Sequence, residues 1–390
     1  MSYISNVTNT SSHLLLETVP FDLTQGTRRL LYAKEQRYIM NNLFEDFFNH
    51  KFPQPQYLGA KTKHLPWIGS HIPKNTKVVL DAFAGSQSVA FYMKQKGLKV
   101  LTNDFLNCNN QIGKSLIENN NARLSEEDVK LLFQNNLNPP EFNLIEKIFK
   151  NIFFEESECK VLDSFRSNVE LLPSLKKALA LAIMNRSLTR KVTMGHFGHT
   201  KALEYANNEE RVRRNRNLAR PIKDIFLDLV KNYNNAVFDN HQDNKSFNED
   251  AVTLISNLDE KIDLLYLDPP YCGSHPDYQG FYHLLETFTE YWKDKKFING
   301  IKHYFPKKIS GFDTKKDILE SFDKLFAVSN KIPYWLISYN DRSYPSQEAM
   351  IEIISKYRKV ALDSKKYHNG VGGKGSVRGS CELLFICSPR

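Results

Sequence analysis

The sequence predicts an α/β fold with one mostly parallel sheet and a mainly helical domain inserted between its strands. Apolar runs typical of buried strands occur at 78–81 and 99–102, and they return at 262–267, 334–338, 360–362 and 382–387. Between the two groups asparagine is abundant and the apolar spacing is helical, at 125–136, 141–152, 170–187 and 218–234. We therefore expect the two groups of strands to form one sheet, with residues 111–244 as the insertion.

The chain before the first strand divides into two parts of different composition. Residues 1–25 are polar and rich in asparagine, serine and threonine, whereas residues 28–49 carry large apolar side chains at mostly helical spacing. This spacing predicts an amphipathic helix. The expected domains are an N-terminal extension with this helix at 1–50, a sheet domain made of 51–110 and 245–390, and the helical insertion at 111–244.

A glycine-bearing turn follows the first expected strand, in the segment Val78-Val79-Leu80-Asp81-Ala82-Phe83-Ala84-Gly85-Ser86. Such a turn lets the backbone approach a ligand closely, and we expect a helix to begin near Ser86. Asp104 ends the next strand, 19 residues after Gly85, where nucleotide-binding βαβ units carry the acid that binds ribose hydroxyls. No G-x-G-x-x-G is present, which favours a single-nucleoside cofactor without a pyrophosphate. The alternative is an ordinary strand-turn-helix with a surface aspartate.

A proline-stopped strand at 262–271 is the most informative motif. An apolar run ends in Asp268-Pro269-Pro270-Tyr271, and the prolines leave a carboxylate and an aromatic ring at the carboxyl end of a strand. Ligands bind at this end of open α/β sheets. A flat base can stack on Tyr271, while Asp268 and the Pro269 carbonyl accept hydrogen bonds from its exocyclic amino group. The alternative is a Pro-stopped strand with a surface tyrosine.

Together these motifs resemble the adenine-specific (N6) DNA methyltransferases that use S-adenosylmethionine. The resemblance is to the class in which the cofactor motifs precede the target-recognition segment and the Asp-Pro-Pro-Tyr motif follows it. Tyr57-Leu58-Gly59-Ala60-Lys61 resembles the family's N-terminal motif, and Asn248-Glu249-Asp250-Ala251 resembles its short acidic motif. The family usually has a second glycine where this chain has Gln87.

The resemblance implies a Rossmann-like methyltransferase sheet with an inserted target-recognition domain, and it implies roles for particular residues. The implied catalytic residues are Asp268, Pro269, Pro270 and Tyr271. The implied contacts to S-adenosylmethionine come from Tyr57, Gly59, Lys61, Asp81, Phe83, Gly85, Ser86, Asp104, Asp250 and Asp268.

The implied reaction is methyl transfer to an adenine that is flipped out of double-stranded DNA, because a base inside the duplex cannot reach the cofactor. A restriction-modification system with a separately acting endonuclease is the expected setting. Three alternatives stay open. Cytosine-N4 enzymes share the fold but typically have serine in place of Asp268. An RNA or protein methyltransferase, or a catalytically silent DNA-binding protein on the same scaffold, would also fit parts of the pattern.

The insertion contains the most basic stretch of the chain. Between residues 186 and 220 there are nine Lys or Arg residues and three Glu. We expect DNA contacts here from Arg186, Arg190, Lys191, His196, His199, Arg213, Arg214 and Arg216. A loop aromatic, Phe197, is placed to insert beside a displaced base. The alternative is a solvated helix face. His196 and His199 have no third ligand nearby, so no metal is expected.

A glycine-rich stretch at 368–379 is expected to form a loop before the last strand. Its Lys374 and Arg378 are further candidates for contacts to the DNA backbone. The alternative is a simple flexible turn, because the stretch lacks the pattern of a phosphate-binding loop.

Composition agrees with these expectations. The 390 residues include 53 Lys or Arg and 44 Asp or Glu, a net charge of +9, which suits a polyanionic partner. The five cysteines show neither a C-x-x-C pattern nor paired histidine spacing, so no zinc site or disulfide framework is indicated. An odd cysteine count without a secretory signal favours a cytoplasmic location. No apolar run approaches the ~18 residues expected of a membrane span.

Overall fold

The computed structural model describes residues 47–135, 142–270, 277–293, 295–298, 303–305, 308, 310–312, 314–367 and 380–390. Of the amphipathic helix expected at 28–49, only residues 47–49 lie inside these ranges, and they are helical. Tyr271, Lys374 and Arg378 lie outside the described residues.

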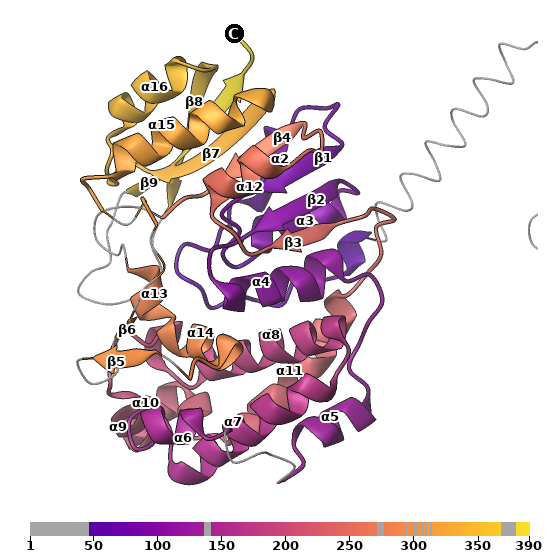
Figure 1. The fold of residues 1–390 in the computed structure, drawn as a ribbon, viewed down its shortest axis with the longest axis vertical. Coiled ribbons are helices and arrows are strands. Elements are labelled where there is room, and N and C mark those ends of the chain that lie inside the picture. The colour runs from indigo at the N-terminus through magenta and orange to yellow at the C-terminus, as the bar shows by residue number, and fades with distance from the viewer. Residues whose placement is uncertain are drawn as a thin grey trace, which may run out of the picture. The chain divides into compact units, whose positions relative to one another are not determined.

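A seven-stranded sheet organises the fold, in the order β3-β2-β1-β4-β7-β9-β8 (Figure 1). Strands β3, β2, β1, β4 and β7 run parallel to their neighbours, whereas β9 pairs antiparallel with both β7 and β8. The strands are β1 (Val78–Asp81), β2 (Lys99–Asn103), β3 (Lys245–Phe247), β4 (Leu264–Leu267), β7 (Tyr334–Asn340), β8 (Lys359–Tyr367) and β9 (Ser380–Ser388). Two groups of strands that are distant in sequence do share one sheet, so the expected fold class is confirmed. The short β3 was not expected.

Helices cover both faces of this sheet. On one face lie α12 (Ala251–Asn257), α15 (Ile318–Val328) and α16 (Gln347–Ser355), which share a buried apolar cluster with β1, β4, β7 and β9. Packed against β1, β2 and β3 are α3 (Ser88–Gln95), α4 (Asn107–Gly113) and the π-helix η1 (Lys114–Glu118), while α2 (Leu65–Ser70) packs on α3. All four residues of β4 are buried, as expected for a central strand of a parallel sheet that is covered on both sides.

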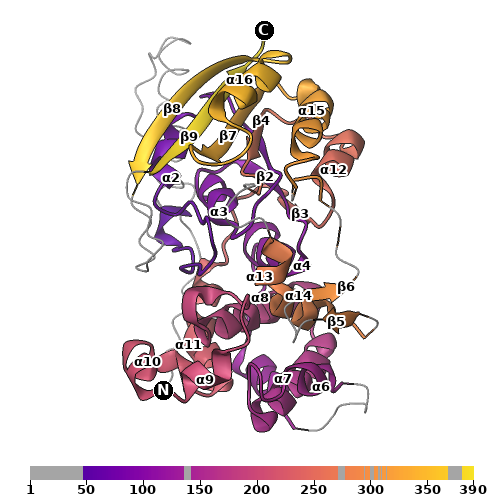
Figure 2. The same ribbon diagram turned by 90° about the vertical axis from the view of Figure 1, so that its left-hand side faces the viewer.

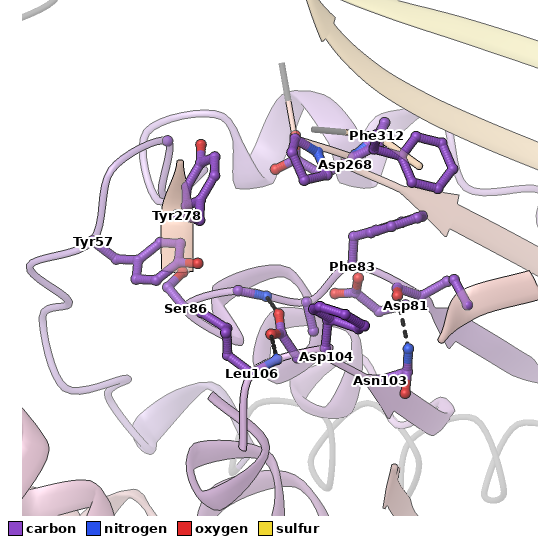
Figure 3. A pocket seen from close by; sticks show the side chains of 18 of the residues that line it. Tyr57, Asp81, Phe83, Ser86, Asn103, Asp104, Leu106, Asp268, Tyr278 and Phe312 are labelled. Carbon is purple, nitrogen blue, oxygen red and sulfur yellow. Dashed lines mark hydrogen bonds between the residues drawn. The ribbon is translucent and has the colours of Figure 1, made fainter. Parts of the chain in front are cut away.

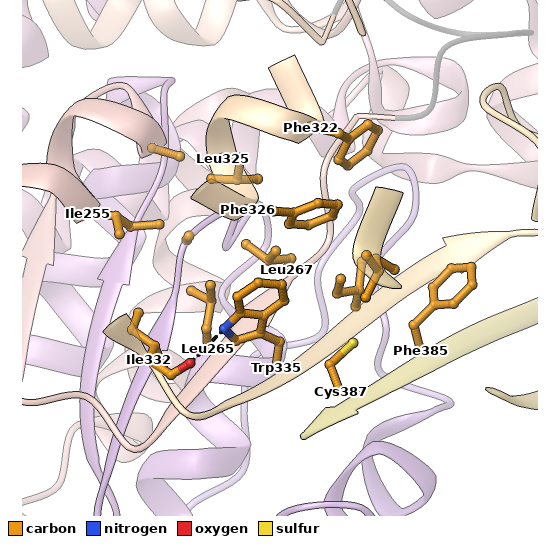
Figure 4. Close-up of a cluster of buried hydrophobic side chains, with 14 of the residues drawn as sticks. Ile255, Leu265, Leu267, Phe322, Leu325, Phe326, Ile332, Trp335, Phe385 and Cys387 are labelled. Carbon is orange, nitrogen blue, oxygen red and sulfur yellow. Dashed lines mark hydrogen bonds between the residues drawn. The ribbon is translucent and has the colours of Figure 1, made fainter. Parts of the chain in front are cut away.

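Trp335 is the largest fully buried side chain and lies near the centre of the apolar cluster (Figure 4). Its ring stacks on Phe326 of α15, with centroids 5.4 Å apart and planes 17° apart. Its indole Nε1 donates to the Ile332 carbonyl at 2.9 Å, so the polar atom of the ring is satisfied inside the core. This packing fixes β7 beside β4, and therefore holds the strand that carries Asp268.

A second, mainly helical part follows α4 in the chain. Its helices are α5 (Glu126–Leu132), α6 (Leu144–Phe149), α7 (Glu156–Asn168), α8 (Ser174–Arg190), α9 (Ala202–Ala206), α10 (Glu209–Arg214) and α11 (Ile222–Ala236). Short 3₁₀ turns connect some of the helices, at η2 (Val169–Leu171), η3 (Thr193–Gly195) and η4 (Arg216–Leu218), and a further one, η5 (Ser329–Lys331), follows α15. Figure 2 shows these helices grouped away from strands β7, β8 and β9, with α8 lying close to α4.

The helical part also receives residues from beyond the Asp-Pro-Pro motif. These are α13 (Tyr278–Phe281), α14 (His283–Glu290) and an antiparallel ribbon of β5 (Lys296–Ile298) and β6 (His303–Phe305). Helix α14 packs on α8 and α4, and the Arg166 guanidinium of α7 donates to the carbonyls of Phe288 and Thr289 at 3.0 and 3.1 Å. Part of the segment expected to belong to the sheet domain therefore packs against the inserted helices. The division into domains at 110 and 245 stays a prediction.

None of the helices in the described part of the chain is both long enough and apolar enough to cross a membrane.

Candidate active site

A pocket opens where β1, β2 and β4 end at the same edge of the sheet (Figure 3). Its space is about 1040 Å³, including the solvent at its mouth. It brings together residues from the glycine turn, the second strand and the Asp-Pro-Pro motif, which are up to 187 positions apart in the chain between Asp81 and Asp268. The candidate residues that line it are Tyr57, Gly59, Lys61, Asp81, Phe83, Gly85, Ser86, Asp104, Asp250, Asp268, Pro269 and Pro270.

The glycine turn is tight, and the structure shows why glycine is needed at its centre. Gly85 has a φ of +47°, and a Cβ added there would lie 3.0 Å from Cε1 of the Tyr57 ring. Gln87 is also left-handed, with a φ of 65°, which explains why a glycine suits this position. Helix α3 begins at Ser88, so the expected start near Ser86 is two residues early.

The Gln87 side chain compensates for its unfavourable backbone. It is fully buried, and its Oε1 accepts a hydrogen bond from the Thr102 hydroxyl at 2.6 Å. Its Nε2 donates to the Asn109 carbonyl at 3.4 Å. These hydrogen bonds connect the turn to β2 and α4. Gln87, which replaces the glycine usual in the family, therefore keeps the turn and adds hydrogen bonds to its neighbours.

Asp104 lies at the carboxyl end of β2, directly beside the glycine turn. Its Oδ2 accepts from the Gly85 amide at 2.7 Å, and its Oδ1 accepts from the Leu106 amide at 2.8 Å and from Asn109 Nδ2 at 3.1 Å. Burial raises the pKa of Asp104 to about 6, against the lowering effect of these hydrogen bonds. The carboxylate is thus held rigidly in the pocket wall, and its charge depends on pH near neutrality.

Asp81 ends β1 inside the pocket and is fully buried. Neither carboxylate oxygen has a hydrogen-bond partner of good geometry. Burial and the nearby Asp268 and Asp104 carboxylates raise its pKa well above the ordinary value, and the weaker influence of the Phe83 and Ala90 backbone opposes this. A buried carboxylate with so little compensation is suited to a ligand that carries positive charge or donates hydrogen bonds.

Asp268 follows β4 and is held by Lys61. The Lys61 ammonium lies 2.9 Å from Asp268 Oδ2 and 3.3 Å from Glu382 Oε1, and it donates to the Gly59 carbonyl at 3.1 Å. Burial alone would lower the pKa of Lys61, but the Asp268 and Glu382 carboxylates raise it above its ordinary value. Two carboxylates thus share one buried ammonium at the point where Pro269 and Pro270 end the strand.

Aromatic rings form another wall of the pocket. Tyr57 stacks on Tyr282 with centroids 4.6 Å apart and planes 7° apart, and Tyr278 lies 6.1 Å from Tyr57. On the other side, Phe83 meets Phe312 edge to face at 5.3 Å. Rings on both sides can hold a flat heterocycle between them.

Three further candidates have local structural roles besides lining the pocket. The Asp250 carboxylate caps α12, because its Oδ1 accepts from the Thr253 amide at 3.0 Å. The Ser86 hydroxyl is buried and donates to the Ser88 hydroxyl at 3.1 Å. Gly59 has a φ of 82°, a conformation that favours glycine and lets its carbonyl reach Lys61.

The basic residues expected to contact DNA fall into two groups. Arg213 and Arg214 extend from α10 into solvent, with side chains 80% and 77% exposed, and Arg216 is exposed on η4. Arg213 pairs with Glu209, and Arg214 pairs with Glu210, each one turn earlier in the helix. Such exposed ion pairs contribute little to the stability of the fold, so the arginines can bind another anion.

Arg186 and Lys191 are engaged with other parts of the protein. Arg186 donates to the Gln54 carbonyl at 3.0 Å and to Gln56 Oε1 at 2.9 Å. Lys191 is only 8% exposed and donates to Glu158 at 2.8 Å and to the Arg220 carbonyl at 2.7 Å. Arg190, at the end of α8, is partly exposed.

The loop at 195–199 does not present its aromatic ring to solvent. Phe197 is fully buried against Phe153, with centroids 5.4 Å apart, and its amide donates to the Phe281 carbonyl at 2.7 Å. The expectation that Phe197 inserts into DNA is therefore wrong for this structure. Partly exposed histidines flank it, and His196 lies 4.9 Å from the Phe281 ring and 6.1 Å from His199. Among the described residues, no cluster of three or more His, Cys, Asp or Glu is placed to hold a metal.

Sequence reasoning missed several residues of the pocket. Asn103 and Phe105 flank Asp104 at the end of β2, and their position beside a strand end is a signal that could have found them. Tyr278 and Phe312 carry no such signal, because long-range packing brings them to the pocket. Glu382, which contacts Lys61 from outside the pocket lining, carries none either.

Comparison with known proteins agrees with this geometry. A family model for D12 class N6 adenine-specific DNA methyltransferases matches residues 57–353, and the chain belongs to this family. It is 32% identical over 350 residues to the type II methyltransferase M2.HphI of Haemophilus parahaemolyticus, covering 88% of this chain and 99% of that protein.

Two longer relatives are also similar. The chain is 28% identical to the modification methylase StsI of Streptococcus sanguinis, over 77% of this chain and 46% of that protein. It is 26% identical to the type II methyltransferase M.FokI of Planomicrobium okeanokoites, over 80% of this chain and 49% of that protein. The chain thus spans about half the length of these two relatives.

Proposed function

We propose that this N6-adenine DNA methyltransferase uses S-adenosylmethionine to methylate a flipped adenine at a specific site in double-stranded DNA. The observation that carries the proposal is the Asp268 carboxylate at a Pro-stopped strand end, in the same pocket as Asp104 and the glycine turn. Asp268 is the acceptor for the amino group of the base, and Asp104 is the acceptor for the ribose hydroxyls of the cofactor.

The charge of the pocket suits this cofactor. Among the described residues that line it, Lys61 is the single basic one, and six carry carboxylates: Asp81, Asp104, Glu249, Asp250, Asp268 and Asp277. S-adenosylmethionine carries a sulfonium and an ammonium group, so an excess of carboxylates around the pocket, of which Asp81 and Asp104 are buried, favours its binding. Lys61 is the counterpart for its single carboxylate. Tyr57, Phe83 and Phe312 supply flat surfaces near the glycine turn, and Asp250 lies at the rim.

The residues act mainly by positioning. When bound, S-adenosylmethionine supplies an electrophilic methyl group. Asp268 and the Pro269 carbonyl accept hydrogen bonds from the two N–H groups of the adenine amino group. These hydrogen bonds direct the nitrogen lone pair toward that methyl. Tyr271, which lies outside the described residues, is the stacking partner for the base. The nitrogen loses a proton after it is methylated, so Asp268 need not be a strong base beforehand.

The DNA-binding surface in this proposal centres on the helical part. Arg213, Arg214 and Arg216 contact phosphates, because they are exposed and close together in the chain. Arg190, at the end of α8, and His196 and His199, on the loop that precedes α9, are the candidates for contacts nearer the bases. Lys374 and Arg378 remain candidates for the DNA backbone. Arg186 and Lys191 are left out of this surface, because their charged groups bind other parts of the chain.

We further propose that the protein is the modification enzyme of a restriction-modification system and acts where the cell's DNA lies, in the cytoplasm. The relatives named type II methyltransferases support this setting. A cognate endonuclease would be a separate partner.

The direct test is to sequence DNA from cells that express the chain, with a method that reports modified bases. The proposal expects N6-methyladenine at one short recurring sequence. Methylated cytosine, or no methylated base in DNA from cells that express folded protein, would contradict it. Cells that express an Asp268→Ala variant provide the control.

A further inference from the structure

Glu382 is a buried acid that lies outside the cofactor and Asp-Pro-Pro-Tyr motifs. It contacts Lys61, which pairs with Asp268 of the Asp-Pro-Pro-Tyr motif. It is 3% exposed and belongs to β9, the antiparallel strand next to β7. Its Oε1 lies 3.3 Å from the Lys61 ammonium and accepts a hydrogen bond from the Ser338 hydroxyl of β7 at 2.6 Å. Burying a carboxylate destabilises the folded protein unless the charge is paired, and the contacts with Lys61 and Ser338 provide this pairing for Glu382.

The role of Glu382 follows from the charges around Lys61. Among the described residues, the groups near its ammonium include Asp268 after β4, Glu382 on β9, Tyr278 on α13 and His64 before α2. If Asp268 were the only carboxylate near Lys61, the pair would be neutral and the ammonium would occupy Asp268 fully. With Glu382 present, the three charged groups sum to −1, and the ammonium is shared.

We propose that Glu382 is a positioning residue of the methyl-transfer site, which draws the Lys61 ammonium partly away from Asp268 and leaves a net negative charge facing the cofactor. Ser338 fixes the orientation of the Glu382 carboxylate. This inference rests on the proposed binding of S-adenosylmethionine and deepens it. It predicts that Glu382 contributes to the preference for the positively charged cofactor over its uncharged-sulfur product, S-adenosylhomocysteine, without touching either ligand.

Calorimetry with the full-length protein and both ligands tests this. Glu382→Gln keeps the shape and an oxygen acceptor for Ser338 but removes the charge. We expect it to weaken S-adenosylmethionine binding by about fivefold more than S-adenosylhomocysteine binding, because only the former carries the sulfonium charge. Glu382→Asp, which retains the charge, should recover most of the preference, and Ser338→Ala should change it less than Glu382→Gln does.

A matched control is available in the helical part. Glu158 forms a similarly buried pair with Lys191, at 2.8 Å, with side chains 16% and 9% exposed. Glu158→Gln should leave the ratio of the two affinities as in the wild type. It reports how removal of a buried ion pair affects the protein in general.

The outcomes separate this inference from the proposed function. Equal weakening of both ligands by Glu382→Gln, or an unchanged ratio, would overturn the positioning role while the proposed function stands. Failure of the wild type to bind S-adenosylmethionine would overturn the proposed function itself. If Glu382→Gln does not fold, Glu382→Asp and Ser338→Ala are compared instead, because both keep the charge at position 382. The inference requires both variants to keep most of the preference for S-adenosylmethionine over S-adenosylhomocysteine. Loss of this preference in both variants would contradict it.

Discussion

The pocket at the sheet edge and the basic surface of the helical part illustrate two ways of building a functional surface. In the pocket, Asp104 is buried and held by hydrogen bonds from the backbone amides of Gly85 and Leu106. On α10, Arg213 and Arg214 are 80% and 77% exposed and pair only with glutamates of the same helix. The first arrangement suits chemistry that needs fixed geometry, and the second suits adaptable contact with a polyanion.

The largest expected effect tests the rigid region. Asp268→Ala should reduce single-turnover methylation by ~10³-fold or more, because the acceptor that positions the amino group is lost. The fold should survive, since Lys61 keeps Glu382 as a partner. Asp268→Asn, which retains one carbonyl acceptor, should lose less activity. Rates are measured with labelled cofactor, and thermal unfolding checks the fold. Near-normal turnover by Asp268→Ala would remove Asp268 from the reaction.

The adaptable region should respond differently. Replacing Arg213, Arg214 and Arg216 together by alanine should weaken binding to all DNA sequences. The slope of log affinity against log salt should fall by about 0.9 for each lost phosphate contact. Catalysis at saturating DNA should be nearly unchanged, because these residues lie outside the pocket. Binding titrations at several salt concentrations measure this.

Lys324, Lys331 and Lys356 provide the matched control for that experiment. They are exposed cations on or next to α15 and α16, and Lys324 pairs with Glu320 one turn earlier, as Arg213 pairs with Glu209. Their replacement should leave the salt slope intact. Equal losses in the two triple variants would mean that general charge, not the α10 surface, binds DNA.

The buried charge of Asp104 provides a pH test of the rigid region. Because burial raises the pKa of Asp104 to about 6, the carboxylate is ionised above pH 6 and becomes protonated below it. Affinity for S-adenosylmethionine should therefore be present at pH 7 to 8 and fall as the pH drops through about 6. Asp104→Asn should lose about 1.5–3 kcal/mol of binding at pH 8 and show a flatter profile, as measured by calorimetry. A wild-type profile that is flat from pH 5 to 8 would exclude this role.

The smallest effect concerns the turn itself. Gln87→Gly and Gln87→Ala both remove the hydrogen bond to Thr102, but only glycine relieves the left-handed backbone. The glycine variant should therefore be more stable than the alanine variant by about 1 kcal/mol, although it buries less. Both should be less stable than the wild type. Chemical denaturation measures the difference, and a more stable alanine variant would show that backbone strain is unimportant here.

The sequence predicts the pocket far better than it predicts the rest of the site. Asp81, Asp104 and Asp268 each end a buried strand, and the carboxyl ends of parallel strands meet at one edge, so their convergence follows from local pattern. Tyr278 reaches the pocket through packing of α13, and Glu382 reaches Lys61 through pairing of β9 with β7. No spacing in the sequence reveals either placement.

The surface residues of the helical part are also hard to predict, because packing between distant segments decides which side chains are buried. A cationic side chain has the same appearance in sequence whether it is exposed, like Arg213, or bound to a buried acid, like Lys191. Gly195 and Gly198 favour a loop around Phe197, yet the Phe197 ring is fully buried against Phe153 in the helical part. Strand β3 is only three residues long and has one buried residue, the polar Ser246, so its apolar signal is weak.

The most direct test of the account uses purified protein, duplex DNA and S-adenosylmethionine with an isotopically labelled methyl group. Digestion of the DNA to nucleosides and mass spectrometry identifies the atom that receives the label. The account predicts labelled N6-methyldeoxyadenosine from the wild type and its loss in Asp268→Ala. Label on cytosine, or equal labelling of adenine by the two proteins, would contradict the assignment of the Asp268 pocket as the site of methyl transfer.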